Sequence, residues 1–130
     1  MKVQYIDIRY YKRFRIYLLF NRIKGVDLMA REKFQTLTEQ MFYILLCLKN
    51  ECCGMDIMEK VREITGGRVT IGPGTLYNLL ESFVTAGMIR ETKVEGRKRS
   101  YMLTGVGRQT LEDEVTRMNV LIRDYGKLME

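Results

Sequence analysis

Residues suited to acid–base or metal chemistry are scarce in this sequence. The 130 residues include no histidine, the side chain that most often serves as general base and as metal ligand. The three cysteines, Cys47, Cys52 and Cys53, form neither a C-x-x-C metal motif nor an even-numbered disulfide set. No carboxylate pair, nucleophile beside a base, or phosphate-binding loop stands in a recognisable arrangement. We therefore expect no enzyme, no cofactor and no bound metal.

Two other groups of residues are suited to holding DNA. The first opens a predicted helix, where the polar side chains are Thr75, Tyr77 and Asn78. A helix lying in the major groove reads base edges from its N-terminal end, and asparagine can pair bidentately with adenine. We assign Tyr77 to a backbone phosphate. The second group is a basic cluster that would clamp the backbone or enter the adjacent minor groove; it comprises Lys93, Arg97, Lys98 and Arg99.

The net charge of +6 is unevenly distributed along the chain. The first 30 residues hold seven basic and two acidic side chains, so the remainder is nearly neutral and any site for a polyanion must be local. The longest apolar run near the N-terminus, "IYLLF", is far too short to cross a bilayer, and no signal peptide is recognisable. Unpaired cysteines fit a reducing compartment. We expect a cytoplasmic protein without a membrane partner.

The basic and aromatic segment 1–28 has two interpretations. Its mixture of tyrosines, phenylalanines and arginines could bind a DNA backbone or a membrane surface. Alternatively, Lys24-Gly25-Val26 can be encoded by a purine-rich ribosome-binding sequence just ahead of the Met29 codon, so that translation would begin at Met29. On that interpretation the segment is an extension of the gene and not part of the native protein.

The chain from residue 36 to 103 is patterned as three helices followed by a hairpin. Thr38 is placed to cap a buried helix, "EQMFYILLCLKN". A second, amphipathic helix follows the turn at "ECCG", with Ile57, Val61 and Ile64 on one face, and Gly66-Gly67 ends it.

The third helix starts at Pro73, which suits a first helical turn, with Gly72 as cap. Its apolar face comprises Leu76, Leu79, Leu80, Phe83 and Val84. Two runs rich in β-formers, "MIRETKV" and "KRSYMLT", flank Glu95-Gly96-Arg97 and predict the hairpin. The fold class is therefore mainly α with a small β-hairpin, a winged helix-turn-helix.

A last helix over residues 104–130, capped by Thr104, carries an apolar seam. The seam repeats with alternating steps of four and three residues, which is a heptad pattern. We expect it to pack against a second copy of the chain and form a homodimer. The alternative is that it folds back over the first helix within one subunit. The seam residues are Leu111, Val115, Met118, Ile122, Tyr125 and Met129.

Four motifs between residues 36 and 129 resemble the PadR family of bacterial transcriptional regulators. "GPGTLYNLL" is similar to the Gly-Thr-Leu-Tyr signature of the family's recognition helix, and "CGMDIMEKV" to the opening of its second helix. "TAGMI" resembles the turn into the wing, and "GRKRSYMLTGVGRQTL" the second wing strand and the entry to the last helix. The resemblance implies a dimeric winged-helix DNA binder, often a repressor. With one C-terminal helix, the chain is similar to the branch that senses small hydrophobic ligands.

The sequence departs from the family pattern at four positions. Met55 replaces an aromatic residue, Asn78 a proline, Ser100 a tyrosine and Gly72 a serine-like cap. The chain also has no tryptophan, so stacking on a flat ligand would need Tyr125, another tyrosine or a phenylalanine.

Two further functions remain as alternatives to DNA-binding regulation by a ligand. One is a regulator whose Cys52 and Cys53 sense oxidation, although adjacent cysteines close a disulfide only with strain. Cys47 is expected to be an apolar filler in the core. The other is a winged-helix module that binds proteins and not DNA, which the nearly neutral core permits.

Overall fold

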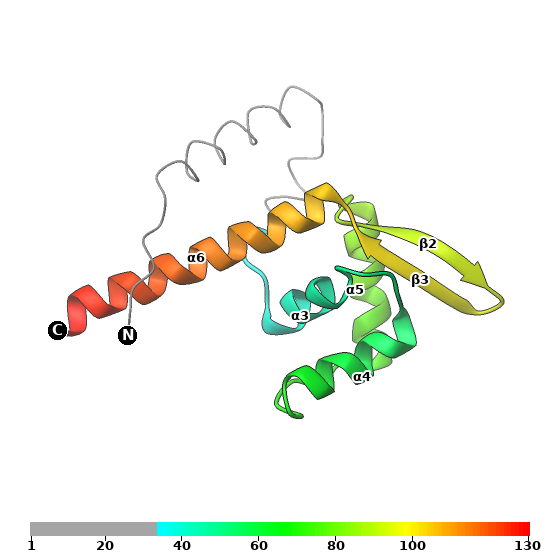
Figure 1. The fold of residues 1–130 in the computed structure, drawn as a ribbon, viewed down its shortest axis with the longest axis horizontal. Helices are drawn as coiled ribbons and strands as arrows, with labels where there is room; N and C mark the ends of the chain where they lie inside the picture. The colour runs from blue at the N-terminus through cyan, green and yellow to red at the C-terminus, as the bar shows by residue number, and fades with distance from the viewer. Residues whose placement is uncertain (1–33) are drawn as a thin grey trace, which may run out of the picture.

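The computed structural model describes residues 34–130, so the predictions for residues 1–28 lie outside the described part (Figure 1). Within that part the chain forms four helices and one three-stranded sheet. This arrangement confirms the predicted fold class, a mainly helical winged helix-turn-helix with a long C-terminal helix. In chain order the elements are α3 (Glu39–Cys47), β1 (Cys52–Cys53), α4 (Gly54–Ile64), α5 (Pro73–Thr85), β2 (Ile89–Glu95), β3 (Lys98–Leu103) and α6 (Gly105–Met129).

The helix starts follow the capping residues predicted from the sequence. The Thr38 hydroxyl accepts a hydrogen bond from the Met41 amide at 3.2 Å and begins α3. Gly72 precedes α5 with Pro73 in its first turn, and the Gly72 carbonyl accepts from the Leu76 amide at 2.9 Å. Local chemistry therefore determines where these helices begin.

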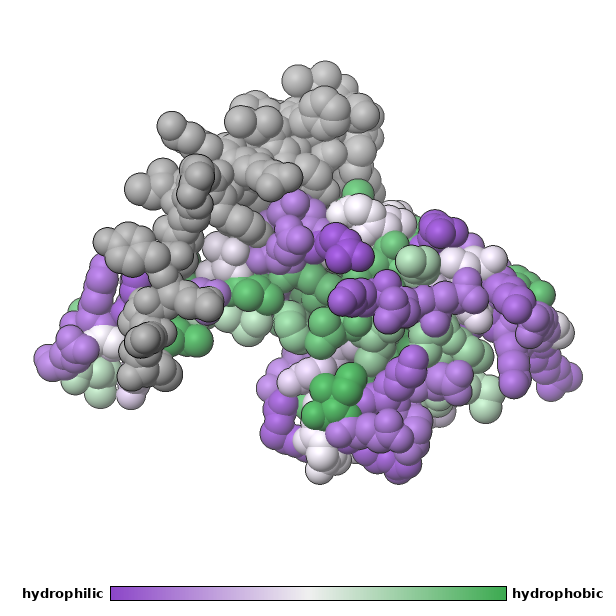
Figure 2. Space-filling model, in the orientation of Figure 1, coloured by the Kyte–Doolittle hydropathy of each residue, from purple (hydrophilic) through white to green (hydrophobic). Residues whose placement is uncertain are grey.

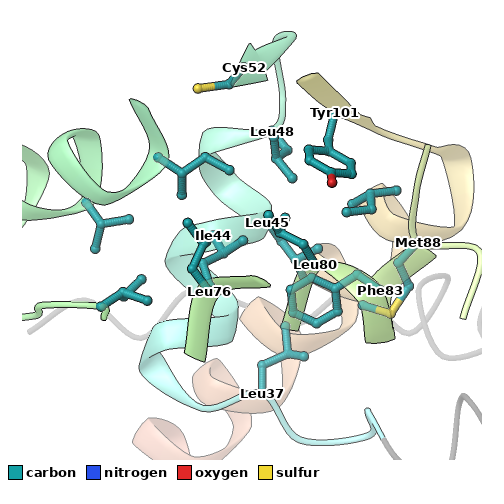
Figure 3. Packing of buried hydrophobic residues seen from close by; sticks show 14 of the residues in the cluster. Leu37, Ile44, Leu45, Leu48, Cys52, Leu76, Leu80, Phe83, Met88 and Tyr101 are labelled. Atoms are coloured by element: carbon teal, nitrogen blue, oxygen red, sulfur yellow. The ribbon is translucent and has the colours of Figure 1, made fainter. Parts of the chain in front are cut away.

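The core lies where α3, α4 and α5 meet one face of the sheet (Figure 3). Ile44, Leu45 and Leu48 from α3 and its C-cap pack with α5 residues in this layer, and Phe83 meets Phe34 edge to face at 5.5 Å. The predicted apolar faces were wrong at two helix ends. Ile64 is 57% exposed and Val84 42% exposed, because neither helix is covered by another element there.

The sheet has the strand order β1-β3-β2 and is antiparallel throughout. The prediction that Cys52 and Cys53 lie in a turn was wrong, since they form strand β1, with Cys52 opposite Tyr101. The Leu103 amide also donates to the Leu48 carbonyl at 2.8 Å and extends this contact. Pairing between residues some fifty positions apart leaves no local signal in a two-residue strand.

β2 and β3 form the wing, a hairpin that extends away from the helices (Figure 1). Its turn contains Gly96 at φ 62°, a left-handed conformation that glycine adopts without strain. An irregularity at Thr92 interrupts the pairing between Glu91 and Lys93. Because of this bulge, the alternation of side chains between the two faces of β2 is offset by one residue after Thr92.

α6 is attached to the rest of the fold by a short backbone junction. The Thr104 hydroxyl accepts from the Gly107 amide at 3.2 Å and donates to the Gly87 carbonyl at 2.6 Å. The Thr104 amide donates to the Met88 carbonyl at 3.0 Å. A Cβ on Gly107 would overlap that same carbonyl oxygen, so the backbone of α6 touches the start of the wing. From this junction α6 runs past α3 and projects beyond it (Figure 1).

We predict that Gly107→Ala destabilises the fold by about 2–4 kcal/mol, because the added methyl group would overlap backbone that cannot rotate away. Gly105→Ala is the matched control, since nothing lies within 4 Å of a Cβ there. The control should change the free energy of unfolding by less than about 0.5 kcal/mol. Urea unfolding monitored by circular dichroism measures both. Equal stability of the two variants would show that the junction tolerates a side chain.

Candidate nucleic-acid interface

α5 turns an apolar face to the core and a polar face to solvent. Leu76, Leu80 and Phe83 are essentially buried and hold the helix in place. The three residues predicted to meet DNA from this helix all lie on the exposed side; they are Thr75, Tyr77 and Asn78. The first exposed turns of α5 therefore carry the side chains proposed for contacts with bases and phosphate.

The turn before α5 is tied to α3 by side-chain contacts. The Arg68 guanidinium contacts Glu39 at 2.8 Å and the Tyr43 hydroxyl at 3.0 Å. The Gln40 amide donates to the Thr70 carbonyl at 3.0 Å. Each exposed contact is weak, but together they connect the α4–α5 turn to the N-terminal half of α3. The turn that leads into α5 is thus held against α3.

Tyr77 is positioned by Gly54, a residue that the sequence analysis did not single out. A Cβ at Gly54 would lie 3.3 Å from Cε1 of Tyr77 and 3.7 Å from its hydroxyl oxygen. The missing side chain therefore lets the Tyr77 ring lie against the first turn of α4, while 47% of the residue stays exposed. The signal in the sequence was the glycine of "CGMDIMEKV", whose structural role depends on a contact with another helix.

Two of the four predicted wing cations are paired with carboxylates of the same hairpin. Lys93 Nζ lies 2.8 Å from Glu95 Oε1, and Arg99 Nη1 lies 3.6 Å from Glu91 Oε2. The hydrogen bond between Lys93 and Glu95 raises the pKa of the lysine and lowers that of the carboxyl group. Among the residues that the structure describes, Arg97 and Lys98 at the turn have no ion pair within 4 Å.

A groove with a volume of about 460 Å³ separates α5 from the wing. It brings Tyr77 together with three of the predicted wing cations, Arg97, Lys98 and Arg99. Thr75, Asn78 and Lys93 do not line it. Figure 2 shows the wing covered mainly by hydrophilic side chains. The arrangement can accept an extended anion between a helix and a hairpin.

Tyr101 forms part of the floor of this groove. It is 6% exposed, and burial raises the pKa of its hydroxyl, with Glu91 contributing in the same direction. The groove also contains the carboxylates of Glu81 and Glu91. Its polar surface is therefore of mixed sign, with the excess of positive charge at the tip of the wing.

The predicted seam of α6 is only partly used within the subunit. Leu111 is 9% exposed and belongs to the core, whereas Val115, Ile122, Tyr125 and Met129 are exposed and Met118 is half-buried. Two exposed leucines outside the predicted seam, Leu121 and Leu128, widen the apolar surface. The heptad pattern missed them because it follows about one residue per helical turn.

A second groove, of about 330 Å³, lies between α3 and the first half of α6. Its apolar lining comes from Phe42, Leu46, Leu111 and Val115. The groove continues directly into the exposed seam of α6, since Leu111 and Val115 belong to both. α3 and α6 are therefore in contact at the proximal end of α6 but do not close over each other.

Over residues 34–130 no cluster of three or more histidine, cysteine or acidic side chains is arranged to hold a metal ion. Within the same range no helix is both long and apolar enough to span a membrane.

Comparisons with known proteins place this geometry in a family. The chain is 30% identical over 79 residues to an uncharacterized 37.1 kDa protein of transposon TN4556 from Streptomyces fradiae; the match covers 61% of the chain but only 22% of that protein. A PadR-like transcription factor structure from Bacteroides fragilis is 26% identical with a TM-score of 0.60, covering 68% of this chain and 88% of that one.

The structure of Bacillus subtilis PadR in complex with operator DNA is 28% identical with a TM-score of 0.53. The match covers 59% of this chain and 46% of the Bacillus protein. A family model, described as the transcriptional regulator PadR-like family, matches residues 44–113. That range runs from α3 through the wing into α6 and exceeds half of the sequence. The chain therefore belongs to the PadR-like family of transcriptional regulators.

Proposed function

We propose that this protein is a homodimeric repressor that binds a specific, two-fold-related DNA site in the cytoplasm. The observation that carries the proposal is the groove in which Tyr77 of α5 faces Arg97, Lys98 and Arg99 of the wing. A helix with an exposed polar face beside a basic hairpin suits a duplex whose adjacent grooves are occupied at once.

In this proposal α5 and the wing make different kinds of contact with DNA. α5 contains no lysine or arginine, so Thr75 and Asn78 read base edges while Tyr77 donates to a phosphate. Arg97 and Lys98 at the wing tip meet the backbone or the adjacent minor groove. Lys93 and Arg99 reach phosphates only by leaving their carboxylate partners. The operator complex of the related Bacillus subtilis PadR supports DNA as the partner.

The dimer is proposed from the symmetry of the α6 seam. Its six positions are placed symmetrically about Val120. In an antiparallel pair of α6 helices, each seam residue would therefore lie opposite a seam residue of the partner. Leu111 would face the partner's Met129, Val115 the partner's Tyr125, and Met118 the partner's Ile122. The α3/α6 groove contains the first two of these positions and would receive the partner's Tyr125 and Met129.

The same groove offers a route for regulation by a small hydrophobic ligand. A compound occupying the apolar space beside Phe42 and Leu46 would compete with the partner's Tyr125. The two recognition helices would then change their spacing, and a two-fold site with half-sites about one helical turn apart would no longer fit both. Repression is proposed because occupancy of a promoter is sufficient for it.

A thiol-sensing regulator is the first alternative, and the contacts of the cysteines argue against it. Burial raises the pKa of both Cys47 and Cys52, which keeps them as unreactive thiols. Cys52 and Cys53 are consecutive residues of β1, so their side chains leave the strand in opposite directions. Joining them would disrupt the pairing with β3.

A protein-interaction module without a DNA role is the second alternative. It predicts no salt-dependent affinity for random duplex, whereas phosphate contacts produce affinity that falls steeply with salt. The decisive experiment is fluorescence anisotropy of the full chain against duplex from upstream of its own gene, with a scrambled duplex at matched salt. Tight, selective binding supports the regulator; no binding to either duplex at low salt would contradict it.

We predict that Arg97→Ala weakens binding to both duplexes and reduces the slope of log affinity against log salt by about one. Asn78→Ala should instead lower affinity for the selected duplex by about 1–3 kcal/mol with the slope unchanged. Anisotropy titrations at several salt concentrations separate the two effects. Unchanged affinity in both variants would contradict the assignment of both surfaces.

We predict that Ile122→Lys converts the dimer to a monomer, because a charge would enter the centre of the seam. Asp124→Lys is the control: it lies two residues away, outside the seam, and should remain dimeric. Sedimentation velocity measures the mass, and circular dichroism checks that each subunit is folded. A monomeric wild-type protein at micromolar concentration would refute the antiparallel pairing.

We predict that hydrogen peroxide leaves operator affinity unchanged and that Cys52 is alkylated slowly at pH 7, since its raised pKa keeps it protonated. Mass spectrometry after a timed iodoacetamide pulse, compared with unfolded protein, gives the rate for each thiol. Loss of affinity after peroxide, absent in Cys52→Ser, would restore the thiol-sensing alternative.

A further inference from the structure

The wing contains carboxylates that already contact two of the basic side chains proposed to bind phosphate. β2 and β3 hold four basic and two acidic side chains, and each acidic side chain contacts a cation proposed to meet DNA. Glu95 holds Lys93 at 2.8 Å along one strand, and Glu91 lies 3.6 Å from Arg99 across the hairpin. In each pair both side chains are at least one-third exposed, so a ligand can reach the cations without unfolding the hairpin.

The pairing places carboxylates on both faces of the hairpin. Lys93 and Glu95 are two residues apart on β2 and share one face, whereas Arg99 lies beside Tyr101 on the face that borders the groove. A phosphate approaching either face therefore meets a cation that already has an anionic partner. Carboxylate and phosphate oxygens accept from the same donors, and the carboxylate is held nearby by the backbone.

We infer that Glu91 and Glu95 restrain the affinity of the wing for any DNA backbone, because each phosphate bound by Arg99 or Lys93 must displace a carboxylate. The inference rests on the proposed function, since it concerns how strongly the same surface binds DNA. Arg97 at the tip supplies the unrestrained attraction, whereas Lys98 lies opposite Glu95 and interacts with its charge. The restraint matters because random sites in a genome vastly outnumber an operator, and backbone contacts supply essentially all affinity for them.

The test is the affinity of the full chain for a random duplex, measured by anisotropy at several salt concentrations. Glu95→Gln should raise this affinity about two- to fivefold, the range expected for freeing an exposed ion-pair partner. Glu130→Gln is the matched control, because it removes the same charge at the end of α6 far from the wing (Figure 1). It should have the smaller effect of net charge alone.

A double-mutant cycle identifies the mechanism. In a Lys93→Gln background, Glu95→Gln should raise affinity no more than the Glu130→Gln control does, since the cation that Glu95 holds is absent. The equivalent cycle with Glu91→Gln and Arg99→Gln tests the other face. Thermal unfolding of each variant checks that the hairpin is intact.

Two results would overturn the inference. Equal affinities of the Glu95→Gln and Glu130→Gln variants would show that the carboxylate does not restrain binding. A gain of undiminished size in the absence of Lys93 would show general repulsion of DNA and not competition for that cation. Either result requires wild-type protein that binds DNA with salt dependence; if it does not, the proposed function fails first and this inference fails with it.

Discussion

The contact between Gly107 and the Met88 carbonyl determines how the two halves of this protein are joined. The backbone of α6 approaches the start of the wing so closely that no side chain fits between them, and Thr104 bonds to both Gly87 and Gly107. Gly87, at φ 71°, directly follows Ala86, the C-cap of α5. One junction therefore sets the directions of α5, the wing and α6 together. In the proposed dimer, the same junction would set the distance between two recognition helices.

Rigidity at this junction has a consequence for regulation. An interface built from α6 transmits a change in subunit geometry only if α6 moves with the DNA-reading unit as one body. The close backbone packing of Gly107 meets that requirement, and the hydroxyl and amide of Thr104 add hydrogen bonds across the same junction. The exposed apolar seam and the α3/α6 groove lie on the far side of the junction from the wing, so an event there would reach DNA through α6 itself.

The surface proposed to bind DNA combines basic side chains with carboxylates that pair with two of them. The described chain is nearly neutral, and positive charge is concentrated on a hairpin that also holds two carboxylates. α5 adds polar side chains without charge and one further carboxylate, Glu81, in the groove. In the proposed complex, base contacts from α5 would therefore carry a larger share of the binding energy than they would beside an unpaired basic wing. Selectivity in such a protein would come from limiting its affinity for random DNA as much as from adding contacts specific to the operator.

The elements with strong local signals were predictable from the sequence. Thr38, Pro73 and Thr104 mark helix starts because capping depends on residues within one turn, and Gly96 marks the wing turn because it needs a left-handed backbone. The polar face of α5 and the basic cluster of the wing were also predictable, since each follows from the spacing of residues along one element.

Which of these residues contact one another became clear only from the folded arrangement. It paired β1 with β3, placed Gly54 beneath Tyr77, and joined Lys93 and Arg99 to carboxylates. It also exposed Val84 and left Leu121 and Leu128 on the surface of α6. Each of these facts depends on which element covers a given position or on the side-chain geometry that folding imposes, and a periodic pattern along one element does not contain that information.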